Sequence, residues 1–408
     1  MNIDLRIDFG QLVHALSDTI DLVGVDELHH GKRVGFMAME CAKLFSTDSR
    51  LHLKLYRLGL LHDCGVSSSQ VHTHLVSELE WADAKRHCLI GAERLRRFAP
   101  LAEFADVVLH HHTGWDELKD LPIAEDIKTH ANLIYLTDRV DALSGMEPFA
   151  TKLSCRDWVC GKIRSLRGTH FKPELVDVLL AASEKEAFWI TQEPQHLRDY
   201  LTQQFNEPDE IWLDHDQLKK MAAIFAEIVD AKSTYTAEHS LGVSRLAAYL
   251  GRRCGLSGET VISLELAGLL HDLGKLQVPD EILDYPRGLE GDFLDIMRQH
   301  SYVTYLILQR IKGLEQIARW GADHHEKLDG SGYPFKRPAN ELSIESRIVG
   351  VADIYQALAQ RRPYRPPMAP HDILMMLKKE VSMGRIDPEL IRIVASDLGQ
   401  CQAAATAA

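Results

Sequence analysis

The sequence predicts an all-α protein built from two tandem copies of one helical domain. Three observations support this fold class. Apolar residues recur through most of the chain at the 3.6-residue spacing of amphipathic helices. The alternating pattern of half-buried strands is scarce. The two halves of the chain also match each other, motif by motif and in the same order.

The composition fits two globular domains of ordinary size. With 408 residues the chain is too long for one compact core. Its residues are 45% hydrophobic and 26% charged, which is typical of a globular protein. A formal net charge of −13 argues against a long nucleic acid as a partner, because phosphate backbones are held by clustered Lys and Arg. No apolar run is long enough for a membrane span, and the first ten residues do not resemble a signal peptide. With seven cysteines and no CxxC pair, we expect a reduced, cytoplasmic location and no membrane partner.

The predicted domain boundaries follow breaks in the helical pattern. Proline and acidic residues interrupt the periodicity around Pro208. We therefore predict an N-terminal domain over residues 1–190, a linker over 191–214 and a C-terminal domain over 215–400. The last residues, 401–408, are predicted to form a disordered tail.

The internal repeat is read from constant spacings between matching motifs. A spacing of 209 pairs LLHDCG at 60–65 with LLHDLG at 269–274. Further along, the spacing becomes 213 and then 215, where HFKPELV at 170–176 matches RIDPELI at 385–391. The spacing changes only between motifs, as expected where loops absorb insertions. The two halves are therefore interpreted as a duplicated domain.

The polar residues that recur at these spacings are of the types that bind metal ions. In the second half they are His239, His271, Asp272, His300, His324, His325 and Asp353. Five histidines and two aspartates in apolar helical sequence are costly to bury unless a cation binds them. Seven such ligands are too many for one tetrahedral ion and suit two, with the adjacent His-Asp pair supplying a bridging carboxylate. A lone helical histidine is more often a core residue, but recurrence of the whole set favours metal binding.

This ordered set resembles the HD superfamily of metal-dependent phosphohydrolases. The stretches HDLGKLQVPDEIL, HHEKLDGSGYP, RIVGVADIYQAL and RPYR resemble its HD-GYP branch, whose members hydrolyse cyclic dinucleotides. The resemblance covers about residues 216–395, while about residues 9–182 resemble an HD or degenerate HD-GYP domain. The resemblance implies that the seven residues above hold a binuclear centre, in which Asp272 bridges the ions and is catalytic. It also implies that Lys275 is catalytic and lies near the scissile phosphate, and that Arg362 and Arg365 hold substrate phosphates.

Two positions depart from the family's pattern. Tyr235 stands where some relatives have a glutamate that holds a third metal, so two ions are expected. Leu328 stands where the family usually has tryptophan, which could change base stacking without touching the ligands. Histidines with carboxylates suit iron or manganese. Two such cations would lower the pKa of a bridging water to give the attacking hydroxide and neutralise the phosphoryl oxygens, while Lys275 or an arginine offsets charge on the leaving ribose oxygen.

The first half keeps a complete second set of potential metal ligands. They are His30, His62, Asp63, His87, His111, His112 and Asp138. Its surroundings differ, because Val66 replaces Lys275, WDELKDL at 115–121 replaces the glycine-rich turn, and Glu147 stands where Arg362 would hold a phosphate. Cys64 and Cys88 adjoin ligands, which could make the site sensitive to oxidation, although inert buried thiols are the favoured interpretation. Three hypotheses therefore remain for this half: a phosphohydrolase for another nucleotide such as a linear product, a ligand sensor, or a structural domain.

The sequence as a whole predicts a phosphodiesterase that opens a cyclic dinucleotide. The expected substrate is cyclic di-GMP or 3',3'-cyclic GMP-AMP, cleaved to the linear dinucleotide and, as an extension, to mononucleotides. Two alternatives stay open: a non-catalytic receptor that signals through the turn Gly332-Tyr333-Pro334, and a hydrolase of other nucleotides in which the first half is also active. Two kinds of protein partner also stay open. One is a protein that binds this turn, and the other is a second copy of the chain in a homodimer.

Overall fold

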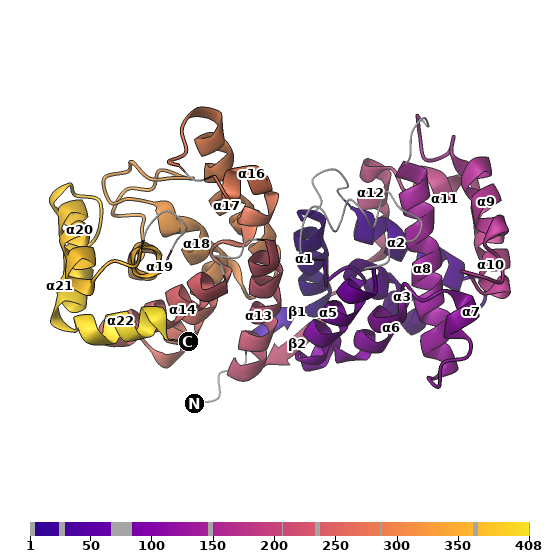
Figure 1. Ribbon diagram of the computed structural model, residues 1–408, viewed down its shortest axis with the longest axis horizontal. Helices are drawn as coiled ribbons and strands as arrows, with labels where there is room; N and C mark the ends of the chain where they lie inside the picture. The colour runs from indigo at the N-terminus through magenta and orange to yellow at the C-terminus, as the bar shows by residue number, and fades with distance from the viewer. Residues whose placement is uncertain are drawn as a thin grey trace. The chain divides into compact units, whose positions relative to one another are not determined.

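The computed structural model divides the chain into two compact units (Figure 1). It describes residues 5–23, 29–66, 84–145, 150–205, 207–232, 237–285, 287–361 and 366–407. We call Leu16–Asp209 the N-terminal unit, and Met1–Ala15 together with Glu210–Ala408 the C-terminal unit. Each unit is described by itself.

The N-terminal unit is helical throughout its described residues. Its elements are the second part of α1 (Phe9–Asp21), α2 (His30–Ala42), α3 (Ser49–Leu61), α5 (Ala84–Arg96), the 3-10 helix η1 (Ala99–Phe104), α6 (Ala105–His110), α7 (Trp115–Leu118), α8 (Glu125–Gly145), α9 (Arg156–Ser165), α10 (Pro173–Ser183), α11 (Glu186–Ile190) and α12 (Pro194–Gln204). The 21-residue helix α8 runs through its core, and Ala131 to Ser144 of this helix are buried.

The C-terminal unit repeats this helical arrangement and adds a small sheet. Its elements are β1 (Leu5–Asp8), β2 (Glu210–Leu213), α13 (His215–Lys232), α14 (Ala237–Arg253), α15 (Gly258–Leu270), η2 (Leu273–Gln277), α16 (Asp280–Leu283), α17 (Gly291–Leu308), α18 (Glu315–Ala322), η3 (Asp323–His325), α19 (Ile344–Ala359), α20 (Pro370–Ser382), α21 (Pro388–Ser396) and α22 (Leu398–Thr406). The predicted all-α class with a duplicated helical domain is confirmed, since α2, α3, α5 and α8 recur as α14, α15, α17 and α19.

The two strands place the start of the chain in the C-terminal unit. β1 pairs antiparallel with β2, so that Leu5 lies opposite Leu213 and Asp8 opposite Glu210. Ile7 is fully buried beneath this pairing. The compact units therefore do not follow the predicted boundary that assigned residues 1–190 to one domain. The predicted linker is also largely structured, because α12 occupies 194–204 and β2 occupies 210–213.

The predicted disordered tail is wrong for residues 401–406, which belong to α22. Cys401 is fully buried, and the Tyr355 hydroxyl of α19 donates a hydrogen bond to Gln402 at 3.2 Å. Close approach is allowed by Gly242 of α14, where a Cβ atom would lie only 2.3 Å from the Ala405 carbonyl oxygen. The alanines of this segment favour a helix that packs on these neighbours.

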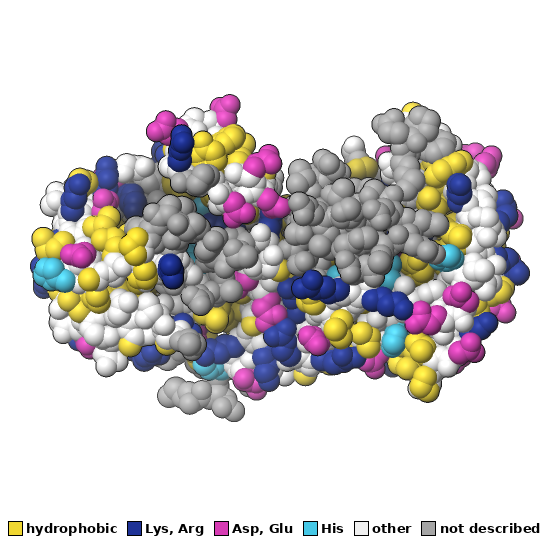
Figure 2. Space-filling model, in the orientation of Figure 1, with side chains coloured by type: hydrophobic (Ala, Val, Ile, Leu, Met, Phe, Trp, Pro, Cys, Tyr) yellow, Lys and Arg dark blue, Asp and Glu magenta, His cyan; other side chains and the backbone are white. Residues whose placement is uncertain are grey.

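Among the described residues, no helix is long and apolar enough to span a bilayer. Figure 2 shows acidic and basic side chains interspersed over the face that it presents. This distribution agrees with the acidic composition of the chain.

Candidate metal centre

The structure brings the seven predicted ligands of the C-terminal unit together from five parts of its fold. His239 lies on α14, His300 on α17 and Asp353 on α19. The remaining ligands are His271 at the end of α15, Asp272 at the start of η2, and His324 and His325 in η3. All are buried except His325, whose side chain is 28% exposed.

Asp272 lies between two groups of imidazoles. Its Oδ2 atom is 3.2 Å from Nε2 of His271 and 3.5 Å from Nε2 of His239. Its Oδ1 atom is 3.5 Å from Nε2 of His300 and 3.9 Å from Nε2 of His324. A carboxylate whose two oxygens face different sets of donors has the geometry of a bridging ligand between two cations.

Asp353 also contacts a histidine of each group. Its Oδ1 atom lies 3.2 Å from Nε2 of His239, and its Oδ2 atom lies 3.9 Å from Nδ1 of His325. One cluster of donor atoms is therefore His239, His271 and Asp353, and another is His300, His324 and His325.

Backbone hydrogen bonds fix which nitrogen of each imidazole faces the centre. His271, His300 and His324 each place Nδ1 against the carbonyl oxygen three residues earlier, at 2.8, 2.6 and 2.6 Å. A carbonyl oxygen only accepts, so Nδ1 donates. In the neutral ring, Nε2 then carries a lone pair directed into the centre, which is the form that binds a metal.

Two of these lone pairs face each other at contact distance. The Nε2 atoms of His300 and His324 are 3.2 Å apart. Two acceptors at that separation repel unless a cation or proton lies near both. Nε2 of His271 and Oδ1 of Asp272 are also buried, and neither has a hydrogen-bond partner among the described residues. These orphaned acceptors fit a bound cation better than they fit a metal-free core.

The protonation states also suit cation binding. Burial lowers the pKa of His300 to about 4 and that of His325 to about 3, so both rings are neutral near neutral pH. Burial opposes ionisation of Asp272, but the neighbouring His271 and Lys275 hold its pKa well below the usual range. Burial opposes protonation of His271, but the Asp272 carboxylate raises its pKa. The centre therefore combines neutral His300 and His325 rings with an ionised Asp272 carboxylate.

Lys275 reaches the same carboxylate from η2. Its Nζ atom lies 2.5 Å from Oδ2 of Asp272, and its side chain is 21% exposed. The ammonium group is thus held at the edge of the centre and remains accessible to a ligand. In the N-terminal unit the matching residue, Val66, is buried and carries no charge.

The glycine-rich turn packs directly on a ligand. A Cβ atom at Gly332 would lie 2.4 Å from Cα of Glu326, so only glycine fits there. The Glu326 carboxylate accepts hydrogen bonds from the backbone N–H groups of Phe335 and Arg337 at 2.6 and 3.1 Å. Tyr333 then places its ring 4.7 Å from the ring of His325, centroid to centroid. The turn therefore holds His325 against the centre.

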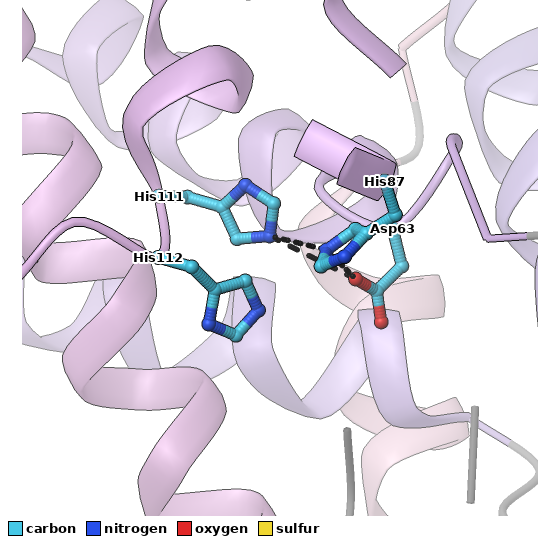
Figure 3. Close-up of side chains that lie close together, drawn as sticks. All are labelled: Asp63, His87, His111 and His112. Carbon is cyan, nitrogen blue, oxygen red and sulfur yellow. Dashed lines mark hydrogen bonds and ion pairs between the residues drawn. The ribbon is translucent and has the colours of Figure 1, made fainter. Parts of the chain in front are cut away.

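The N-terminal unit assembles its seven residues in the same way. These are His30, His62, Asp63, His87, His111, His112 and Asp138. Oδ2 of Asp63 lies 3.4 Å from Nε2 of His62 and 3.7 Å from Nε2 of His30, while Oδ1 lies 3.3 Å from Nε2 of His87 and 3.8 Å from Nε2 of His111. Figure 3 shows the His87 and His111 rings converging on this carboxylate, with His112 beside them.

The outer partners of the two centres differ, and the sequence analysis missed them. Asp141 accepts a hydrogen bond from Nδ1 of His30 at 2.7 Å and from Nε of Arg33 at 2.6 Å. At the spacing of 215, the matching residue is Gln356, whose Oε1 atom lies 2.5 Å from Nδ1 of His239. Both follow a ligand aspartate by three residues on a helix, which is the signal that could have identified them.

Some residues of the sequence analysis lie outside the described ranges. They are Tyr235, Arg362, Arg365 and Glu147. Leu328, the position where tryptophan is usual, is half-buried. Its backbone N–H donates a hydrogen bond to the Arg385 carbonyl at 2.9 Å, and its carbonyl accepts one from the Ala339 N–H at 3.1 Å.

Comparison with known proteins identifies the family. Models of the HD domain match residues 28–143 and 211–390. The 3'3'-cGAMP-specific phosphodiesterase 1 of Vibrio cholerae is 36% identical over 403 residues, covering 97% of this chain and 93% of that protein. This chain belongs to the HD-GYP family. A cyclic di-GMP phosphodiesterase of Thermotoga maritima is 37% identical over 147 residues, which is 35% of the HD-GYP chain described here and 40% of the relative.

The tandem fold of this HD-GYP protein also has a solved counterpart. The crystal structure of a cyclic GMP-AMP-specific phosphodiesterase of V. cholerae matches it with a TM-score of 0.66 and 24% identity. The match covers 98% of each chain. The likeness of fold therefore extends over nearly all of both chains.

Proposed function

We propose that this HD-GYP protein is a metal-dependent phosphodiesterase that opens a cyclic dinucleotide in its C-terminal unit. The observation that carries the proposal is the placement of Asp272 between two groups of imidazoles, with Lys275 at the edge of the same centre. Relatives that are similar over the whole chain or over one domain act on cyclic dinucleotides, as their names state. The N-terminal unit lacks both the lysine and the glycine-rich turn.

The donor set fits a binuclear centre. His239, His271 and Asp353 would hold one ion and His300, His324 and His325 the other, with Asp272 shared. Two divalent ions, with iron or manganese best suited to these ligands, would supply an acidified water and neutralise charge on the phosphoryl oxygens. A second centre is proposed in the N-terminal unit on the same grounds.

The chain's own residues would position and stabilise the reacting phosphodiester. The new bond joins phosphorus to a water oxygen, and the bond to one ribose oxygen breaks, so negative charge develops on that leaving oxygen. Lys275 is the described cation placed to offset this charge. Arg362 and Arg365 are proposed to hold the substrate phosphates, as bidentate donors suit phosphate geometry.

The preferred substrate is proposed to be 3',3'-cyclic GMP-AMP. Support comes from the relative that is 36% identical along nearly all of both chains, whose name states this specificity. Cyclic di-GMP is the second candidate, because the Thermotoga relative is named for it. Seven free cysteines favour a reducing compartment, so a cytoplasmic location is proposed as well.

Cleavage by metal-loaded protein tests the proposal directly. Purified full-length protein would be incubated with each cyclic dinucleotide, and products separated by chromatography. Asp272→Ala should abolish cleavage, while the matched change Asp63→Ala should leave it largely intact. No turnover of either substrate by protein shown to contain metal would refute the proposal, and tight binding without turnover would favour a receptor. Loss of cleavage in folded Asp63→Ala protein would mean that the active unit is assigned wrongly.

A further inference from the structure

Cys88 lies beside the N-terminal ligands at a position where the C-terminal unit has a serine. It follows His87 on α5, and at the spacing of 213 its counterpart Ser301 follows His300 on α17. The Cys88 side chain is buried, and its Sγ atom is 3.8 Å from Nε2 of His87. The Ser301 hydroxyl occupies the same relation to His300, at 3.2 Å from Nε2. Both side chains therefore approach the metal-facing nitrogen of their neighbour.

We propose that the Cys88 thiolate binds the ion held by Asp63, His87 and His111, which gives the N-terminal centre a sulfur ligand that the C-terminal centre lacks. The inference goes beyond the phosphodiesterase function and rests only on metal binding by the N-terminal unit. When the ion binds, the S–H bond breaks, a sulfur–metal bond forms and the proton passes to solvent.

Three donor atoms surround Nε2 of His87 at separations close to the edges of a coordination polyhedron, with sulfur slightly farther away. Nε2 of His87 is 3.2 Å from Nε2 of His111, 3.3 Å from Oδ1 of Asp63 and 3.8 Å from Sγ of Cys88. Around a tetrahedral ion with ordinary metal–nitrogen and metal–sulfur bonds, neighbouring donors lie about 3.3 to 3.6 Å apart. Each of these three donors thus lies close enough to Nε2 of His87 to share an ion with it, sulfur being the most distant at 3.8 Å. His112 lies in the same cluster and can add a further donor.

A second observation points to a ligand at this spot. Oδ1 of Asp63 is buried and has no hydrogen-bond partner among the described residues. Asp63 is only 6% exposed, so water does not readily satisfy this oxygen. Nδ1 of His111 meets the Val108 carbonyl at 2.6 Å and must donate to it, which leaves the Nε2 lone pair directed at the same spot. An ion there satisfies both acceptors together with sulfur.

The competing role for Cys88 is that of an inert buried thiol. Its Sγ also lies 3.4 Å from the Ala84 carbonyl oxygen, to which a thiol could donate. Cys64 offers a matched comparison, because it too adjoins a ligand but donates to the Gly91 carbonyl at 3.6 Å. Of the two thiols, Cys88 has its sulfur 3.8 Å from a metal-facing imidazole nitrogen, whereas Cys64 has its sulfur against a backbone carbonyl.

A thiolate would separate the metal preferences of the two centres. Sulfur is a softer donor than the serine hydroxyl, so the N-terminal centre should favour thiophilic ions such as zinc. It also adds negative charge and occupies a coordination position that Ser301 leaves to water or substrate. The N-terminal centre should therefore hold its ion more tightly and polarise a ligand less than the C-terminal centre.

Cobalt substitution of the full-length protein tests the sulfur ligand. Metal would be removed with a chelator and Co²⁺ added, while absorption is followed in the near ultraviolet, where thiolate-to-cobalt charge transfer appears. We expect this band in the wild type and in Cys64→Ser, and its loss in Cys88→Ser. The affinity of the N-terminal centre for zinc should also fall roughly tenfold or more in Cys88→Ser. Absence of the band in wild type shown to bind cobalt, or its persistence in Cys88→Ser, would overturn the inference.

The reciprocal variant Ser301→Cys keeps the test decisive if Cys88→Ser fails to fold. It should add a second thiolate ligand and increase the band about twofold, because the two positions are geometrically equivalent. An unchanged band in folded, cobalt-loaded Ser301→Cys would contradict that equivalence and count against the inference. These readouts do not depend on turnover, so they remain separate from the test of the proposed phosphodiesterase.

Discussion

At the scale of single residues, the facing imidazoles of the C-terminal unit set what the centre can hold. His300 and His324 direct Nε2 lone pairs at each other across 3.2 Å, so the metal-free protein carries a local repulsion that a cation removes. His300 is the position we use to test this repulsion. Thr304 and the backbone of η2 pack beside it.

We predict that His300→Gln changes the metal-free and metal-loaded proteins in different ways. The metal-free protein should keep its free energy of unfolding or gain slightly, since one of two repelling acceptors is replaced by a group that can donate. Stabilisation by added Mn²⁺ should shrink by about 1.4 kcal/mol for each tenfold loss of affinity. Urea unfolding with and without Mn²⁺ measures both quantities. Equal stabilisation of the variant and the wild type by metal would contradict His300 as a ligand.

Asp21, at the end of α1, gives a pH-dependent prediction for the N-terminal unit. Burial raises its pKa to about 6, and its carboxylate accepts a hydrogen bond from the His29 backbone N–H at 2.9 Å. In the unfolded chain an aspartate has a pKa near 3.9, so between about pH 4 and pH 6 the folded protein binds the additional proton. Stability contributed by this group is therefore lost as the pH rises through that window.

The variant Asp21→Asn should lack this dependence. Between about pH 5 and about pH 7.5, the free energy of unfolding of the wild type should fall by about 1.4 kcal/mol relative to the variant. Urea unfolding at the two pH values measures the difference, and groups common to both proteins cancel in it. Parallel pH profiles for the two proteins would show that Asp21 is not buried in its neutral form.

At the scale of elements, the centre depends on the close approach of η2 to α17. A Cβ atom at Gly274 would lie 2.0 Å from the His300 carbonyl oxygen, and Gly65 meets the His87 carbonyl at 1.9 Å in the other unit. Backbone cannot yield as a flexible side chain can, so a side chain at either position must push the helix that carries a ligand.

We expect Gly274→Ala to destabilise the C-terminal unit and weaken its metal centre. The overlap should cost roughly 1 to 3 kcal/mol or more, as overpacked cores do. Gly258→Ala is the matched control, because nothing lies within 4 Å of a Cβ there and the residue begins α15. Thermal unfolding and metal content measure both effects. A variant as stable and as metal-rich as Gly258→Ala would contradict the close approach.

The sequence was sufficient for elements whose information is local or repeated, and insufficient for those defined by distant contacts. The candidate metal ligands could be predicted because seven residues recur in order, and the structure brings them together. The pairing of β1 with β2 joins residues about two hundred positions apart, so no local pattern reports it. α22 was missed for the same reason, since its alanines became informative only with Gly242 opposite them.

At the scale of the whole molecule, the two units solve the same packing problem with different residues. In the N-terminal unit, Arg33 reaches from α2 to the buried carboxylate of Asp141, to which Lys152 also donates at 3.3 Å. At the matching position of the C-terminal unit, Gly242 leaves room for Gln356 and for α22. A charged pair in one copy thus corresponds to a neutral amide and a glycine in the other, and each arrangement holds the first histidine of its centre.

This divergence predicts that Asp141→Asn strongly destabilises the N-terminal unit, although a neutral amide, Gln356, stands at the matching position of the C-terminal unit. Asp141 is fully buried, and the amide would leave Arg33 and Lys152 without the carboxylate that balances them. Breaking such a buried pair should cost roughly 3 to 5 kcal/mol in the free energy of unfolding. The double variant Asp141→Asn/Arg33→Met should recover part of this loss, because it removes one uncompensated charge together with its partner. Urea unfolding of the two variants and the wild type measures the coupling between Asp141 and Arg33. A loss in the free energy of unfolding below about 1 kcal/mol, or no recovery in the double variant, would show that charge balance does not stabilise this part of the N-terminal unit.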